Sequence, residues 1–186
     1  MEALSFLGSL GAGFATGFVM LTGLAVYQYL RVRDLAAAGR AEALLAVSGT
    51  DVTLERQWCE LSTLKSGLDA SASRANLITA SIPTLALLGT CVGFFFAILQ
   101  TGQLDLGSDP QETLMALMDG GVATALATTV CGQGIYFLLG QAWAALVAGP
   151  YEEAHTLLTE ALGLVRARLS TTSSLDAPWP MAVGDR

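Results

Sequence analysis

The sequence alternates between long apolar stretches and shorter charged ones. Three stretches, 3–30, 75–104 and 120–151, contain no Asp, Glu, Lys, Arg or His. Each is longer than the roughly 20 apolar residues that an α-helix needs to cross a bilayer. The pattern therefore predicts an all-α membrane protein with three transmembrane helices and with further helices that extend into the cytoplasm.

The edges of these stretches divide the sequence into seven segments. The predicted segments are transmembrane helix 1 over 1–30, a cytoplasmic helical region over 31–74, transmembrane helix 2 over 75–100, an acidic extracytoplasmic loop over 101–119, transmembrane helix 3 over 120–149, a cytoplasmic helix over 150–170 and a disordered tail over 171–186. Ser48 to Asp51 is a turn-forming run, so the region 31–74 is expected to contain two helices, 32–47 and 51–70.

Two junctions have more specific signals. Pro110 suits the first turn of a helix, which predicts a helix over 111–118 that leads into the third span. Gly149 and Pro150 predict a kink where the third span ends.

The basic residues predict the topology. All nine Lys and Arg residues fall in 31–74 or after the third span. With three crossings these segments share one side of the membrane, and the positive-inside rule makes that side the cytoplasm. The N-terminus is then expected outside and the C-terminus in the cytoplasm.

A cleavable signal peptide is the alternative interpretation of the first span. The basic residues of a signal peptide would precede the apolar stretch, whereas here Glu2 precedes it and Arg31 and Arg33 follow it.

Composition and charge narrow the class of protein. The sequence is 53% hydrophobic and 13% charged, against about 25% charged residues in soluble domains. Its net charge of -7 and its lack of a Lys/Arg cluster argue against nucleic acid as a partner and leave the lipid bilayer as the expected surroundings. The loop residues Asp105, Asp109, Glu112 and Asp119 could concentrate cations, or could simply be solvated.

Few side chains suggest enzyme chemistry. Cys59, Cys91 and Cys131 lack disulfide or metal-site spacing and are expected to be buried as small hydrophobic residues. The sequence has no GxxxxGK, HExxH or GxSxG motif, and His155 is its only histidine, for which a solvated or packing role is expected. We therefore expect no enzyme activity, no cofactor and no metal site. Tyr27 and Tyr29, near the end of the first span, lie where interfacial aromatic residues occur.

The second and third spans carry polar and small residues in mid-membrane. The candidate ion-pathway residues are Thr90, Thr124, Thr128 and Thr129, and the candidate helix-packing residues are Pro83, Gly89, Gly93, Gly121 and Gly132. Glycines let helix backbones approach closely, and threonine hydroxyls can bond a neighbouring helix or ordered water. A threonine can also bond only the carbonyl four residues earlier in its own helix.

The order of these residues resembles the MotA/TolQ/ExbB family of ion-driven membrane motors. The second span reads IPTLALLGTCVGFF and is similar to the family pattern A-P-L-L-G-L-L-G-T-V-x-G, matching at Pro83, Gly89, Thr90 and Gly93 among others. The third span reads GGVATALATTVCG and is similar to G-I-x-x-A-L-x-x-T-x-x-G, with matches that include Gly121, Thr129 and Gly132. Three spans favour the ExbB/TolQ branch over MotA, which has four.

The resemblance implies a pore-forming subunit in a bacterial inner membrane that conducts protons to drive a partner. It implies a homopentamer around two copies of a single-span protein similar to ExbD, TolR or MotB, whose membrane aspartate carries the ion past Thr90 and Thr129. ExbB and TolQ have a glutamate where this sequence has Thr124, which leaves sodium as an alternative ion. The alternative function is a structural scaffold that keeps the packing glycines and conducts nothing.

Overall fold

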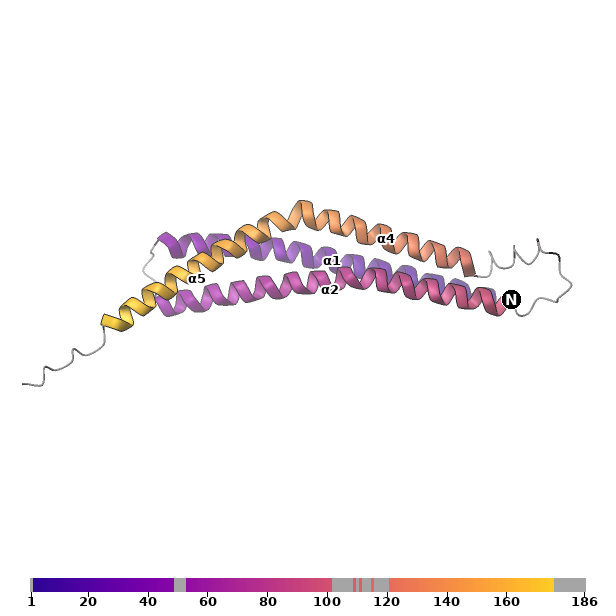
Figure 1. Cartoon of the computed structure of the whole chain (residues 1–186), viewed down its shortest axis with the longest axis horizontal. Helices are drawn as coiled ribbons and strands as arrows, with labels where there is room; N and C mark the ends of the chain where they lie inside the picture. The colour runs from indigo at the N-terminus through magenta and orange to yellow at the C-terminus, as the bar shows by residue number, and fades with distance from the viewer. Residues whose placement is uncertain are drawn as a thin grey trace, which may run out of the picture. The chain divides into compact units, whose positions relative to one another are not determined.

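The protein is almost entirely helical where its structure is described. The computed structural model describes residues 2–48, 53–101, 109, 111, 115 and 121–175, with side chains for 11–48, 53–99, 109, 111, 115 and 121–171. The elements are α1 (Glu2–Ser48), α2 (Leu54–Thr101), α4 (Ala123–Trp143), a π-helical segment (Ala144–Ala148) and α5 (Gly149–Leu175) (Figure 1).

Three stretches are helical, long enough and apolar enough to cross a membrane. They are Gly11–Ser48, Leu54–Leu99 and Ala123–Thr171. For the described residues, the predicted all-α class is therefore confirmed, as is the prediction of three helices that are long and apolar enough to cross a membrane.

The helices run past the edges of the predicted segments. The first span and the helix expected over 32–47 form one element, α1, because no glycine or proline separates Leu30 from Val32. The break expected after Ser48 lies between α1 and α2. There the Thr53 carbonyl accepts the backbone N–H groups of Arg56 and Gln57 at 3.0 and 3.2 Å and starts the next helix.

Local residues also account for the junction between α4 and α5 and for the C-terminal end of α5. The π-helical segment directly precedes Gly149 and Pro150, where a kink was expected, and proline cannot donate a backbone hydrogen bond to the preceding turn. At the C-terminal end, α5 continues through Leu175 and so enters the segment expected to be disordered. The Ser170 and Thr171 hydroxyls support these turns by donating to the Ala167 carbonyl at 2.8 and 2.9 Å.

The acidic loop is described only at single residues. Gln111 and Met115 are helical, and the Gln111 N–H donates to the Asp109 carboxylate at 3.2 Å, as at a capped helix N-terminus. Asp105, Glu112 and Asp119 lie outside the described residues, as does the tail after Leu175.

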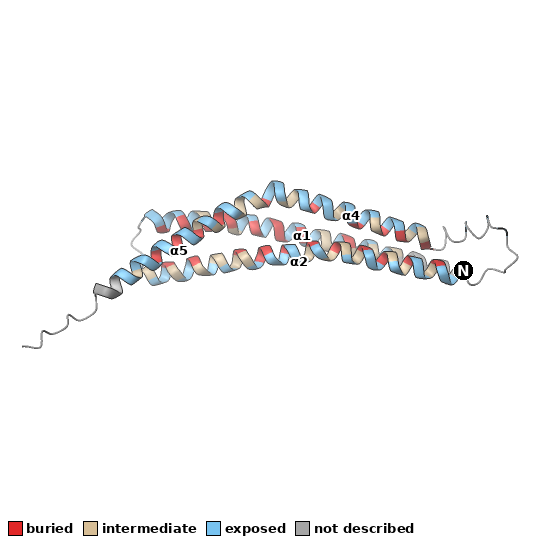
Figure 2. Cartoon of the chain, in the orientation of Figure 1, coloured by how far each residue is buried: buried red, intermediate tan, exposed pale blue. Residues whose placement is uncertain are grey.

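The protein divides into two compact units. The first unit comprises Met1–Tyr29 and Ser73–Ala145, and the second comprises Leu30–Ala72 and Leu146–Arg186. In the first unit, α1, α2 and α4 lie side by side around small buried residues such as Ala25, Ala86 and Ala125 (Figures 1 and 2).

Large apolar side chains of the first unit point outward from all three helices. Exposed examples are Val19, Met20, Leu77, Ile98, Val130 and Leu138. An apolar exterior around a core of small side chains suits helices that pack against one another and face lipid.

Tyr29 packs in the core of the first unit, whereas Tyr27 is exposed. Its side chain is 7% exposed, and its ring meets the Trp143 ring edge-on with centroids 5.1 Å apart. The Thr79 hydroxyl donates to the Ala75 carbonyl, so the Tyr29 hydroxyl donates to Thr79 Oγ1 at 2.9 Å. Tyr29 thereby ties α1 to both α2 and α4.

Replacing Tyr29 by phenylalanine should lower stability by about 0.6–1.7 kcal/mol, the range for interhelical hydrogen bonds in membranes. The ring contact with Trp143 is retained, so the change isolates the hydroxyl. Thermal unfolding of the purified protein in detergent measures the effect, with Tyr27→Phe as the control because Tyr27 is 57% exposed. Equal unfolding temperatures for the two variants would rule out a contribution from this bond.

The second unit packs α1, α2 and α5 around larger aliphatic side chains. Its buried residues include Val32, Leu61, Leu68, Leu158 and Val165. Polar contacts lie around this core: Arg40 pairs with Glu153 at 2.8 Å, and Lys65 Nζ donates to Thr159 Oγ1 at 2.9 Å.

His155 belongs to a polar cluster of the second unit. Its Nε2 lies 3.7 Å from Asp69 Oδ1, which also accepts the Tyr151 hydroxyl at 3.2 Å. The His155 and Tyr151 rings stack with centroids 5.9 Å apart. The side chain is thus half-exposed and held by neighbours on α2 and α5.

The three cysteines are exposed, so the burial expected for them is wrong. Cys59, Cys91 and Cys131 are exposed free thiols. Cys91 illustrates the reason: it follows the half-buried Thr90, and one residue turns a helix by about 100°.

Candidate functional site

The backbones of α2 and α4 approach closely along a seam of small residues. The buried seam positions are Ala86, Gly89, Gly93 and Ala97 on α2, and Gly121, Ala125, Thr128 and Gly132 on the facing segment. A Cβ at Gly93 would lie 2.7 Å from the Gly121 carbonyl oxygen, and a Cβ at Gly89 would lie 3.0 Å from Thr128 Cβ. Larger side chains would force the helices apart.

Two further glycines are required by this approach. Gly121 has a φ of 145°, which side chains disfavour, and a Cβ there would overlap the Gly93 carbonyl oxygen. A Cβ at Gly132 would overlap Ala86 Cβ and lie 3.2 Å from the Phe18 ring of α1. Four of the candidate packing residues, Gly89, Gly93, Gly121 and Gly132, therefore all lie in the seam.

Pro83 lies one turn before the seam rather than in it. It is half-buried inside α2, and its missing N–H leaves the Thr79 carbonyl without its usual helical donor. The same Thr79 bears the hydroxyl that Tyr29 contacts.

Thr90 and Thr129 meet across the seam. Their hydroxyls are hydrogen-bonded to each other, and both side chains are partly buried. Thr90 Oγ1 also lies 2.9 Å from its own-helix acceptor, the Ala86 carbonyl, and 3.4 Å from the Ala125 carbonyl. Thr129 Oγ1 lies 2.9 Å from the same Ala125 carbonyl.

This pair has more hydrogen-bond acceptors than donors. The two hydroxyls hold one proton each, while two carbonyls and the hydroxyl oxygens themselves can all accept. The protons can be placed in more than one arrangement, and each leaves oxygen lone pairs available to a cation or a donor. Neither hydroxyl ionises at ordinary pH. The pair can therefore coordinate or orient an ion, but it cannot supply a charged group that neutralises the ion.

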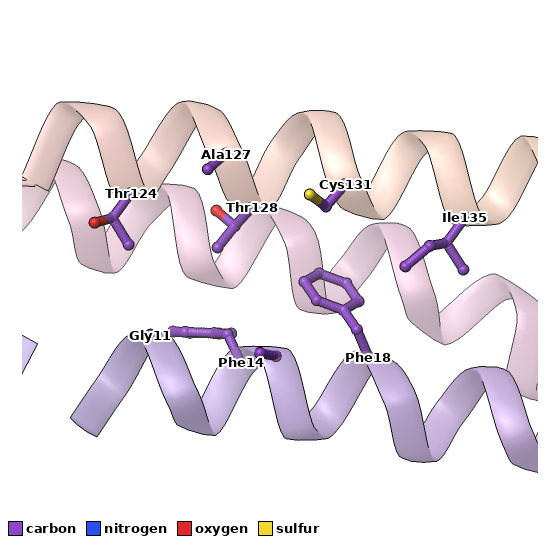
Figure 3. Close-up of a pocket in the computed structure, with 9 residues that line it drawn as sticks. Gly11, Phe14, Phe18, Thr124, Ala127, Thr128, Cys131 and Ile135 are labelled. Atoms are coloured by element: carbon purple, nitrogen blue, oxygen red, sulfur yellow. The ribbon is translucent and has the colours of Figure 1, made fainter. Parts of the chain in front are cut away.

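Thr124 and Thr128 also lie beside α1, although Thr128 contacts Gly89 of α2 as well. Both line an open groove of 380 Å³ between α1 and α4, together with Phe14, Phe18 and Cys131 (Figure 3). The buried Thr128 hydroxyl donates to the Ala125 carbonyl at 3.0 Å, which satisfies it inside the subunit. The groove is lined almost entirely by apolar side chains, so its surroundings differ from those of the Thr90–Thr129 pair.

The four candidate ion-pathway threonines therefore form two overlapping sets, because Thr128 lines the groove beside α1 but also lies against Gly89 and shares the Ala125 carbonyl with Thr129. Sequence spacing indicated the Thr124–Thr128 set, while the Thr90–Thr129 contact needs the register between two helices. The Ala125 carbonyl accepts hydrogen bonds from hydroxyls of both α2 and α4. The sequence indicated its role only through its position four residues before Thr129, the usual spacing of a threonine and its own-helix acceptor. Within the described part of the chain, no group of His, Cys, Asp or Glu side chains is placed to hold a metal ion.

Comparisons with known proteins identify no relative of this sequence. No protein-family model matches the sequence, and neither the curated proteins nor the solved structures compared with it give a match.

Proposed function

We propose that the protein is the pore-forming subunit of an ion-motive-force-driven membrane motor similar to ExbB, TolQ and MotA. The observation that carries the proposal is the Thr90–Thr129 hydroxyl pair, which joins α2 and α4 within stretches that have no Asp, Glu, Lys, Arg or His. These are the two threonines at which the sequence motifs of the second and third spans resemble the family.

The pair requires a partner that brings the charge. A charged group in mid-membrane is costly, and protonation of a carboxylate removes that cost. Hydroxyls can donate to an ionised carboxylate and accept from a protonated one, so they suit a surface past which such a group moves. In this proposal a single-span partner similar to ExbD, TolR or MotB supplies a membrane aspartate, and two copies stand inside a homopentamer of this subunit.

The proposed setting is a bacterial inner membrane with the N-terminus outside and the C-terminus in the cytoplasm. The distribution of basic residues supports this orientation. Protons are the proposed ion, and sodium is the alternative because Thr124 stands where ExbB and TolQ have a glutamate.

A specific observation favours a second candidate, a non-conducting structural scaffold. Thr90, Thr128 and Thr129 each find a main-chain acceptor inside the subunit, at Ala86 or Ala125. Helix packing alone accounts for hydroxyls satisfied in this way.

Ion flux separates the two candidates. The complex is purified from its native membrane with whatever single-span protein accompanies it, and is placed in liposomes under a proton gradient or a sodium gradient. The motor predicts flux of one ion that depends on the copurifying protein and its membrane aspartate. Silence under both gradients, with a complex that still contains that protein, would favour the scaffold.

A further inference from the structure

One face of α1 in the second unit is apolar and uncovered. Leu44 and Leu45 are 61% and 50% exposed, and Ala37 and Ala41 are exposed on the same side. We call these four residues the outer face of α1. It points away from the face that carries the buried residues Val32, Ala36, Gly39, Ala43 and Ala46. The helix is therefore apolar on two opposite sides, although the subunit buries only one.

Lipid is a poor cover for this face. Leu44 comes thirteen residues after Arg31, where the charge-free stretch has ended, or about 20 Å further along the helix. The intervening residues include Arg33, Arg40 and Glu42. Exposed leucines at such a position call for a protein surface rather than hydrocarbon.

The exposed side of α5 has matching features at matching heights. Gly39 lies against Leu158, because a Cβ on this glycine would be 2.9 Å from Leu158 Cδ1, and the Ala46 carbonyl lies 3.4 Å from Arg168. The two contacts show that α1 and α5 run in the same direction. Leu44 and Gly163 each lie five residues after the Gly39–Leu158 contact, so they are at about the same height.

Gly163 is a notch on the surface of α5. No atom lies within 4 Å of the position where its Cβ would be, and the neighbouring Leu164 and Ala167 are exposed. A leucine from another helix at this height can fill the notch without displacing any side chain.

Charge also matches at the other end of the face. Arg33 and Glu152 each lie six residues before the Gly39–Leu158 contact, and both are exposed. Neither has an ionic partner among the residues that the structure describes. Copies that share one topology in a membrane are related by rotation about its normal, which keeps residues of equal height opposite one another.

We propose that the outer face of α1 packs against α5 of a second copy of this chain, with Leu44 over Gly163 and Arg33 paired with Glu152. The two surfaces differ, so the contact is heterologous and leads to a ring when the rotation closes. The proposal rests on the homo-oligomer of the proposed function but does not depend on ion conduction.

Disulfide cross-linking in membranes tests the contact. Leu44→Cys and Gly163→Cys are introduced together into a variant whose native cysteines are replaced by serine, since a disulfide requires Cβ atoms about 3.5–4.5 Å apart. Mild oxidation should give a ladder of dimers and higher species on a denaturing gel. Leu44→Cys with Glu60→Cys is the matched control, because Glu60 is exposed on α2 of the same unit, and it should give at least fivefold less ladder.

A charge swap tests the second contact. Arg33→Glu should reduce the ladder severalfold, and adding Glu152→Arg should restore it. Three results would overturn the proposed interface. The first is cross-linking confined to single chains, and the second is a ladder equal to that of the control pair. The third is a double swap that inserts properly into the membrane but does not restore the ladder. A full ladder from a complex that passes no ions would uphold the interface and count against the motor.

Discussion

Alanine at Gly132 is expected to destabilise the protein by about 1–3 kcal/mol, the usual cost of forcing atoms into a filled core. The added Cβ would overlap Ala86 Cβ on α2 and press on the Phe18 ring of α1. Because these neighbours belong to two other helices, relaxation requires α4 to move. Thermal unfolding in detergent should show a decrease of about 2–4 °C for each kcal/mol in a chain of this size.

Gly134→Ala provides the matched control two residues further along α4. Nothing lies within 4 Å of the Cβ position at Gly134, and alanine is favoured over glycine in a helix by about 0.8–1.0 kcal/mol. Its unfolding temperature should therefore stay the same or rise. Opposite signs for two identical substitutions would establish the seam, and equal changes would contradict the close approach of α2 and α4.

Valine at Thr90 or Thr129 should leave the complex assembled and reduce ion-driven activity about tenfold or more. Hydrogen bonds to charged groups contribute about 1.5–3 kcal/mol, and each 1.4 kcal/mol is about tenfold. Stability should change little, because the Ala125 carbonyl keeps the Thr128 hydroxyl as a donor in either variant. The measurement compares ion flux and partner copurification for each variant with those of the unmodified complex.

Two controls separate the hydroxyl from side-chain shape. Thr90→Ser restores the hydroxyl and should recover most of the flux. Thr16→Val removes an exposed hydroxyl that bonds only the Ala12 carbonyl of its own helix, at 2.8 Å, and should have no effect. Normal flux in both Thr90→Val and Thr129→Val would remove this pair from the mechanism and leave the scaffold as the better function.

The spanning helices could be predicted because their signal is local. A charge-free stretch such as 75–104 is long enough to cross a bilayer whatever surrounds it. The end of α1 at Ser48 was predictable for the same reason, since turn-forming residues act on their own backbone. The end of α5 was less predictable, because Ser170 and Thr171 favour a loop or support a helix depending on which carbonyl their hydroxyls reach.

The sequence by itself determined that this protein is helical, that three of its stretches can span a membrane and which residues are small enough for close packing. The tertiary structure decided which of those residues meet. It buried Tyr29, exposed the three cysteines, paired Thr90 with Thr129, and placed Thr124 and Thr128 along a groove beside α1. The physical reason is that hydrophobicity and turn formation belong to a segment, whereas a contact depends on the rotation and register of two helices, where one residue shifts the facing side chain by about 100°.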